Sequence, residues 1–233
     1  YFLNSKYAKR TIIGDINIIR NFSSETAIRF YNDWYRPDLM AVIAIGDFDP
    51  KYVESLVKKF FNKVKAKNKR PLPDTTIPKY QKTIYVPQKD SEQTSTAINI
   101  LNKNLKLKSD TVGNARELHI RTFCIQIFQH RLDSILLDKK SALFKGYIGT
   151  FNLTLNNEFY YIVAQLNEDE IKEGINILFT EIERVKQNGF TSKELEIEKE
   201  KEMLFYEQAI KAKKTRSTDS IVAEYTRNFL ENE

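Results

Sequence analysis

The sequence has few of the residues from which compact reactive centres are usually built. Its 233 residues include one cysteine, two histidines, one tryptophan, seven glycines and six prolines. A single cysteine excludes a disulfide within the chain, and the scarcity of glycine and proline favours regular secondary structure. No apolar run approaches the roughly 18 residues that a membrane-spanning helix needs, so we expect no membrane span.

Both ends of the sequence look cut. No basic segment followed by an apolar stretch precedes Tyr1, as it would in a signal peptide, and the last residues stop in the middle of a helical pattern. We therefore expect a fragment of a longer protein. Apolar residues make up 41% and aromatic residues 12%, which is enough for a packed core and argues against disorder.

The net charge of +6 leaves a nucleic-acid partner open. The densest basic run consists of Lys63, Lys65, Lys67, Lys69 and Arg70. No aromatic residue that could stack on a base is interleaved with it, so we favour a solvated helix end over a nucleic-acid site.

The first 65 residues contain three helix or strand signals after an irregular arm with a turn at Gly14-Asp15. Residues 23–36 have a serine cap and a proline stop, which predict a helix. Residues 39–45 form a short, continuously apolar run, typical of a strand covered on both faces. Asp49 and Pro50 then favour the start of an amphipathic helix with one apolar stripe, made of Val53, Leu56, Val57, Phe60 and Phe61.

Residues 66–80 are the best linker candidate, because they hold half of all the prolines and almost no apolar residue. We therefore predict one unit over residues 1–65, a proline-rich linker over 66–80 and a second unit over 81–233.

The second unit reads as strands followed by helices. Strands are expected at 82–87 and 93–101, paired as a hairpin or as neighbours, and again at 145–155 and 159–166. Asp110 should open a long helix between the two pairs, with the apolar stripe Ala115, Ile120, Phe123, Cys124, Ile127, Phe128, Leu132, Ile135 and Leu136. This order predicts an α+β fold with a largely antiparallel sheet and helices on one face.

Three further helices are expected after the last strand. The first covers residues 168–187 and ends at Asn188-Gly189, where glycine can take a left-handed C-cap. Residues 191–194 (Thr-Ser-Lys-Glu) form a capping box, which should start a charged helix that runs to about Lys213. The last helix begins near 217–219.

No group of side chains has the spacing of a catalytic or metal site. His119 and His130 lie 11 residues apart on the predicted long helix, about 16 Å along its axis, and cannot share one metal. Cys124 is expected to be a buried structural thiol among apolar neighbours. A run of glutamates alternates with lysines, so ion pairing on a solvated helix face is favoured over acid–base chemistry: Glu194, Glu196, Glu198, Glu200 and Glu202.

Several motifs in order resemble the insulinase/pitrilysin-type zinc metallopeptidases, the inverzincins. The clearest lie in residues 5–65: the segment 5–14 (SKYAKRTIIG), the segment 34–40 (WYRPDLM) and the turn 46–48 (GDF). Residues 83–233 look more loosely like the homologous domain that follows, by element order and by residues 132–147.

The resemblance implies a LuxS/mitochondrial-processing-peptidase-like fold, in which paired α+β domains face each other across a chamber. It also implies zinc in the parent protein, held by a His-x-x-Glu-His motif that is absent here and would lie upstream of Tyr1. No cofactor and no metal is then expected on this chain. Residues 1–65 would be the end of a catalytic-type domain, and residues 81–233 a truncated, inactive partner domain.

One family feature can be compared residue by residue. In the distal half of many members, an arginine and a tyrosine seven positions later contact the substrate. Here Lys140 stands seven residues before Tyr147, so the arginine is replaced, and this domain resembles the second rather than the distal one. Lys140 and Tyr147 remain candidate substrate contacts, with sheet packing as the alternative for Tyr147.

Three functions follow from these observations. The favoured one is a chamber-wall segment of a bacterial zinc metalloendopeptidase that degrades peptides and packs against the other domains of the same protein. The alternative is a non-catalytic homologue that acts as an assembly or interaction subunit. A nucleic-acid module is the third, and it would depend on the basic run 63–70. The family further suggests a periplasmic or cell-envelope location.

Overall fold

The computed structural model describes residues 2, 4–10, 13–65, 70–154 and 156–231. The chain divides into two compact units. Unit 1 comprises residues 1–78 and 215–233, and unit 2 comprises residues 79–214. The boundary at 78/79 falls inside the predicted proline-rich segment, whose first residues, 66–69, lie outside the described part of the chain.

Unit 2 is built on a three-stranded antiparallel sheet of β1 (Thr96–Leu105), β2 (Leu143–Thr154) and β3 (Asn157–Leu166). The strand order is β1-β3-β2, so β3 is central and forms a hairpin with β2. In the register, Ile100 and Ile148 both face Ile162 across the ladders. Three of the expected strands are therefore confirmed, and the sheet is antiparallel as the short connections predict.

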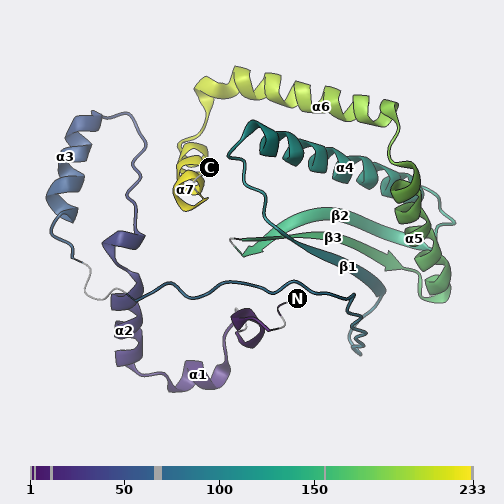
Figure 1. Cartoon of the computed structure of the whole chain (residues 1–233), viewed down its shortest axis with the longest axis horizontal. Helices are drawn as coiled ribbons and strands as arrows, with labels where there is room; N and C mark the ends of the chain where they lie inside the picture. The colour runs from purple at the N-terminus through teal and green to yellow at the C-terminus, as the bar shows by residue number, and fades with distance from the viewer. Residues whose placement is uncertain (1, 3, 11–12, 66–69, 155, 232–233) are drawn as a thin grey trace. The chain divides into compact units, whose positions relative to one another are not determined.

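Helices cover one face of this sheet, which confirms the predicted α+β class. Figure 1 shows α4 (Val112–Leu136) along the sheet, α6 (Ser192–Lys211) alongside α4, and α5 (Ile171–Asn188) at one end. The 3-10 turns η3 (Glu168–Glu170) and η4 (Ala212–Thr215) flank α5 and α6. The core between the helices and the sheet consists of Phe128, Leu132, Leu143, Ala164, Leu166 and Leu178.

The two faces of the sheet can be told apart by Gly146. A Cβ atom built on Gly146 would lie 3.7 Å from Leu132 and 3.8 Å from Leu136, both on α4. Because successive residues of a strand point to opposite faces, Tyr147 points away from α4. Arg121 of α4 donates a hydrogen bond to the Tyr160 hydroxyl at 3.1 Å, which places residue 160 on the helix side and residue 161 on the other.

Unit 1 is mainly helical. It contains η1 (Lys6–Lys9), α1 (Ile16–Asn21), α2 (Ser24–Trp34), η2 (Pro37–Leu39), α3 (Pro50–Phe61) and α7 (Thr218–Glu231). The predicted caps are confirmed, since Ser23 caps α2 and Asp49 caps α3, with Pro50 in the first turn. The short helix α1 falls within the arm expected to be irregular, where Asp15 accepts hydrogen bonds from two backbone N–H groups.

A polar cluster ties the end of α2 to the start of the proline-rich segment. Arg36 donates a hydrogen bond to the Arg70 carbonyl oxygen at 2.8 Å, and Arg70 forms an ion pair with Asp33 at 3.2 Å. The Arg70 guanidinium also lies over the Trp34 ring, 5.8 Å from its centroid. Asp33 and Arg36 are buried, so Arg70 is anchored to the end of α2.

Two predicted strands are wrong. Residues 40–45 have no regular secondary structure and follow η2, and residues 82–87 likewise form no strand and have no ladder partner among the described residues. The expected hairpin between 82–87 and the next strand therefore does not form among the described residues. The reason is that an apolar, β-branched run predicts an extended backbone, whereas a strand also needs a neighbour to accept and donate its hydrogen bonds.

Within residues 2–231 as described, no helix is both long and apolar enough to cross a membrane.

Candidate functional site

Three helices of unit 2 meet at Arg131. Its guanidinium donates two hydrogen bonds to Glu194, from Nε to Oε1 at 2.7 Å and from the second terminal nitrogen to Oε2 at 2.9 Å. It donates a third to Glu181 at 3.1 Å and a weaker one to the Gly189 carbonyl oxygen at 3.3 Å. Arg131 thus joins α4 to the end of α5 and to the first turn of α6.

The local sequence explains why Glu194 is in place. Thr191 accepts a hydrogen bond from the Glu194 backbone N–H, and the Glu194 carboxylate accepts one from the Thr191 backbone N–H, which completes the predicted capping box. Gly189 adopts a φ of 65°, as the predicted C-cap of α5 requires. The connection between α5 and α6 is therefore held by its own local contacts as well as by Arg131.

The electrostatics of this joint favour the charged forms of both partners. Arg131 holds the pKa of Glu194 down to about 2, with further help from the Thr191 backbone. Glu194 and then Glu181 raise the pKa of Arg131 further above its ordinary value. A bidentate arginine–carboxylate pair at the start of a helix is thus ionised throughout the physiological range.

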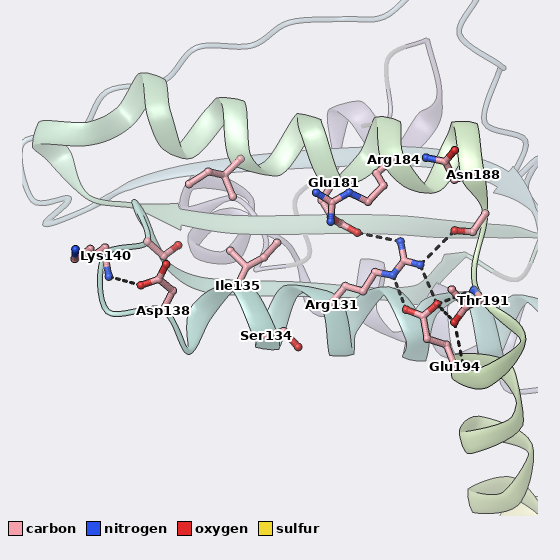
Figure 2. A pocket seen from close by; sticks show the side chains of 13 residues that line it. Arg131, Ser134, Ile135, Asp138, Lys140, Glu181, Arg184, Asn188, Thr191 and Glu194 are labelled. Atoms are coloured by element: carbon pink, nitrogen blue, oxygen red, sulfur yellow. Dashed lines mark hydrogen bonds and ion pairs between the residues drawn. The ribbon is translucent and has the colours of Figure 1, made fainter.

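A hollow of about 760 Å³ lies beside this joint. Figure 2 shows Arg131 at one end, between Glu181 and Glu194, and Lys140 at the opposite end of the group. Glu181 is only 3% exposed and also pairs with Arg184 at 3.0 Å. Ser134, on α4, lines this hollow, and its hydroxyl donates a hydrogen bond to the His130 carbonyl oxygen. The arginines and glutamates of the hollow pair with one another, which makes this part of it a structural joint between helices.

The run of glutamates on α6 is not a wholly solvated face. Glu198 is 3% exposed and lies 2.7 Å from the Lys201 ammonium and 3.0 Å from Nε2 of His130. Glu202 lies 3.3 Å from His119. The successive contacts show that α4 and α6 run antiparallel and that every second glutamate of the run, one in each four residues, faces α4. The expectation of a solvated face holds for Glu196 and Glu200, which are exposed, and is wrong for the three others.

The histidines do not fit a metal site. Both lie on α4 as predicted, and each contacts a different turn of α6. His130 has a lysine ammonium 2.9 Å from its Nε2 atom, where a cation would have to bind. Among the residues that the structure describes, no group of three or more His, Cys, Asp or Glu side chains could hold a metal ion.

The other residues singled out in the sequence lie apart. Lys140 lies in the turn after α4 and is exposed, and Tyr147 lies on β2 with 53% of its surface exposed. Cys124 is exposed, so the expectation of a buried thiol is wrong: it is not among the core residues, although Phe128, about one helical turn later, is. Partial desolvation of the sulfur, followed by the charge of Glu117, raises its thiol pKa, which makes it a weak nucleophile at neutral pH.

Sequence reasoning missed Arg131. It lies 63 residues from Glu194 and 50 from Glu181, and no local pattern links these positions. The capping box marked one end of the interaction, but no signal in the sequence identified the arginine that completes it. Of the basic run, Lys67 and Lys69 lie outside the described residues, and Lys63 and Lys65 are exposed after the end of α3.

Comparison with known families identifies the chain. Residues 21–202 match the model of the peptidase M16 inactive domain. The chain belongs to this family. The match covers most of both units as described here, which agrees with the inverzincin resemblance of the sequence.

Relatives of this M16 domain include zinc proteases. The probable zinc protease PqqL of Haemophilus influenzae is 28% identical over 198 residues, which are 82% of this chain and 21% of that protein. The first half of the periplasmic protease PqqL of Escherichia coli has the same fold, with a TM-score of 0.81 over 99% of this chain and 50% of that structure, at 18% identity. An insulinase-family protease of Yersinia pestis aligns with a TM-score of 0.67 over 88% of the chain, at 14% identity.

The M16 domain spans only about a fifth of the length of the curated relatives that it matches, 21% for the Haemophilus protein. The Haemophilus relative carries zinc in its name, whereas no group of three or more His, Cys, Asp or Glu side chains among the described residues of this chain could hold a metal ion. The family match, to a domain described as inactive, makes the chain a non-catalytic segment of the metalloprotease type.

Proposed function

We propose that this chain is a wall segment of a zinc-dependent metalloendopeptidase that degrades peptides. The observation that carries the proposal is the match of residues 21–202 to the inactive M16 domain, together with the similarity of the chain to a protein named as a probable zinc protease. In this view the zinc ligands and the water-activating glutamate are supplied by another part of the parent protein, and no step of hydrolysis passes through residues of this chain.

The surface of unit 1 supports a role within a larger assembly. Large apolar side chains of α2 and α3 are more than half exposed, among them Phe30 at 59%, Tyr31 at 60% and Phe60 at 65%. The apolar residues 40–45 follow with no strand partner among the described residues. Exposed apolar surface of this kind is typical of a protein–protein interface. We propose that residues 1–65 complete a catalytic-type domain, that residues 81–233 belong to an inactive partner domain, and that 66–80 connect them.

Two finer points belong to the same proposal. The Escherichia coli relative is described as periplasmic, which supports a periplasmic or cell-envelope location for the parent. Lys140 and Tyr147 are kept as candidate contacts for the peptide substrate. Both are exposed, as such a role requires.

The test compares the full-length parent protein with this chain alone. The full-length protein should cleave an unstructured peptide, lose activity on treatment with a chelator and regain it with zinc. The isolated chain should carry less than one tenth of an equivalent of zinc after gel filtration, measured by elemental analysis. A full-length protein that binds its partners but cleaves no peptide would instead support the assembly-subunit alternative, and stoichiometric zinc on the isolated chain would overturn the proposal.

A further inference from the structure

The face of the sheet that points away from α4 has an unusual composition. It is formed by alternate positions 97–103 of β1, 145–151 of β2 and 159–165 of β3, which the register aligns in rows. Two of these side chains are lysines, Lys103 and Lys145, and none is a carboxylate. We call this surface the open face, because α4 and α5 pack on the opposite side and α6 packs on α4.

Aromatic rings form the floor of the open face. The rings of Phe151 and Phe159 are stacked with centroids 5.3 Å apart, and the Phe151 ring lies 5.8 Å from that of Tyr161. Phe159 is 2% exposed, whereas Phe151 is 37% exposed and Tyr147 is 53% exposed. The aromatic surface available to a ligand is therefore concentrated on β2.

The absence of a side chain at Gly149 leaves room for the Tyr161 ring on this face. A Cβ atom at Gly149 would lie 2.7 Å from the hydroxyl oxygen of Tyr161 and 2.9 Å from the adjacent ring carbon. The missing side chain thus lets the Tyr161 ring cross from β3 over the backbone of β2. Between Tyr147 and Phe151, the surface of β2 is therefore covered by the Tyr161 ring and not by a side chain of β2 itself.

The exposed lysine of β2, Lys145, lies close to the exposed tyrosine of the same strand, Tyr147. Lys145 and Tyr147 are two residues apart on one strand, so their side chains leave the same face about 7 Å apart. Both are exposed. Lys103 lies in the row of Phe159 and Phe151, at the end of the open face opposite Lys145. Its ammonium lies 4.3 Å from the centroid of the Tyr80 ring, so Tyr80 of this chain already occupies that end of the face.

We infer that the open face binds an extended peptide segment in which a carboxylate side chain stands two residues from an aromatic or large apolar one. An extended peptide repeats its side chains on one face every two residues, which matches the spacing from Lys145 to Tyr147. The carboxylate would pair with Lys145, and the apolar side chain would pack on Tyr147 and the flat Tyr161 ring. The inference rests on the proposed function, because it gives the wall segment a part in holding the peptide substrate.

Single-stranded nucleic acid is the other ligand class that uses lysines and aromatic rings. The structure favours the peptide. The open face carries only two lysines and no arginine. The Phe159 ring is only 2% exposed, so a nucleic-acid base cannot stack on it. A strand of phosphates would need a longer basic track than this face provides.

Fluorescence anisotropy of short labelled probes on the 233-residue chain tests the inference. The probes are an unstructured peptide with the order Glu-Gly-Phe, the same peptide with Lys in place of Glu, the same peptide with Ala in place of Phe, and an oligothymidylate. The Glu-Gly-Phe probe should bind best. Lys145→Glu should weaken its binding by about fivefold, as expected for a solvent-exposed attraction turned into a repulsion.

Lys199→Glu is the matched control, because it makes the same change of net charge at an exposed lysine of α6. It should change the affinity by less than twofold. Tyr147→Ala should weaken the Glu-Gly-Phe probe and leave the Ala-containing probe unchanged. Circular dichroism melting curves of each variant establish that the fold is retained, and all three positions are exposed enough for this to be expected.

Each outcome decides the inference. Equal affinity for the Glu and Lys peptides, an unchanged affinity of Lys145→Glu, tighter binding of the oligothymidylate or no binding of any probe would overturn it. The proposed function is judged separately. If the full-length protein cleaves the Glu-Gly-Phe peptide with zinc while Lys145→Glu in that protein leaves its KM unchanged, only the inference fails. If the full-length protein cleaves no peptide, the proposed function fails.

Discussion

Arg131 joins two carboxylates at the meeting point of the helices of unit 2. It contacts Glu194 and the buried Glu181, and its guanidinium carbon lies 5.1 Å from the centroid of the Phe190 ring. Removing one partner of a buried charge is destabilising, so the loss of Arg131 should weaken the fold although Glu181 would keep its pair with Arg184. The stabilisation depends on the ionised form of Glu194, and this makes it sensitive to acid.

Acid should weaken the fold through Glu194. Its pKa is lowered from 4.5 to about 2 in the folded protein, so between those values the unfolded chain binds a proton that the folded chain does not. The contribution is therefore complete above pH 4.5 and is lost as the pH falls towards 2, by at most about 3 kcal/mol. Urea unfolding as a function of pH measures this loss.

Glu194→Gln isolates the effect, because glutamine keeps the capping box and removes the charge. The variant should be less stable than the wild type at pH 7 and should show a flatter pH dependence between pH 4.5 and 2. Glu196→Gln, at an exposed neighbour on the same helix, should follow the wild-type curve. Parallel curves for the wild type and Glu194→Gln would contradict the assignment of this acid sensitivity to Glu194.

At the scale of single elements, the sequence was most reliable where the signal is local. The cap at Asp49, the capping box at 191–194 and the left-handed Gly189 were predicted from neighbouring residues and are confirmed. The predictions of strands at 39–45 and 82–87 were wrong. Whether such a run pairs in a sheet depends on a neighbouring strand, and the sequence of the run itself does not show whether that neighbour is present. The exposure of Cys124 and the burial of Glu198 were missed for the same reason, since both depend on which helix packs against which.

Gly189 should tolerate substitution poorly. Its φ of 65° and ψ of −149° belong to a region of the backbone map that is almost restricted to glycine. Gly189→Ala should therefore lower the free energy of unfolding by about 1–3 kcal/mol, although no atom would obstruct the new Cβ. Denaturant titration measures the change.

Gly113 offers the matched control within the same unit. It lies in the first turn of α4, where an added Cβ would meet only the Thr111 hydroxyl at 4.0 Å. Gly113→Ala should raise the stability by up to about 1 kcal/mol, because alanine favours the helix. Equal effects of the two substitutions would show that backbone conformation at Gly189 is not the cause.

At the scale of the whole molecule, the chain consists of two units, and one of them is assembled from both ends of the sequence. Helix α7 belongs to unit 1 although it follows all of unit 2. The sequence predicted the boundary near residue 80, and it assigned everything after that point to the second domain. The structure groups residues 215–233 with unit 1, whereas the proposed division into peptidase domains, which stays a prediction, keeps them in the second domain.

Limited proteolysis should cut the chain near this boundary. Lys79, Lys82 and Lys89 are exposed and lie outside helices and strands, so trypsin should cleave there before it cleaves the lysines of α5. Mass spectrometry of the first fragments identifies the sites. Early cleavage at Lys172 or Lys186 in α5 would show instead that the helical layer of unit 2 opens before the boundary does.

The sequence by itself determined the class of fold, the helix caps, three of the strands and the resemblance to the insulinase-type peptidases. These features depend on interactions among residues that are close in the chain, or on motifs that are read in order. The tertiary structure decided which helices share charges at Arg131, which face of the sheet stays open, and how Gly149 lets Tyr161 lie flat. These features depend on contacts between distant segments, and a pattern of apolar and charged residues can predict that a contact is needed without identifying the residue that makes it.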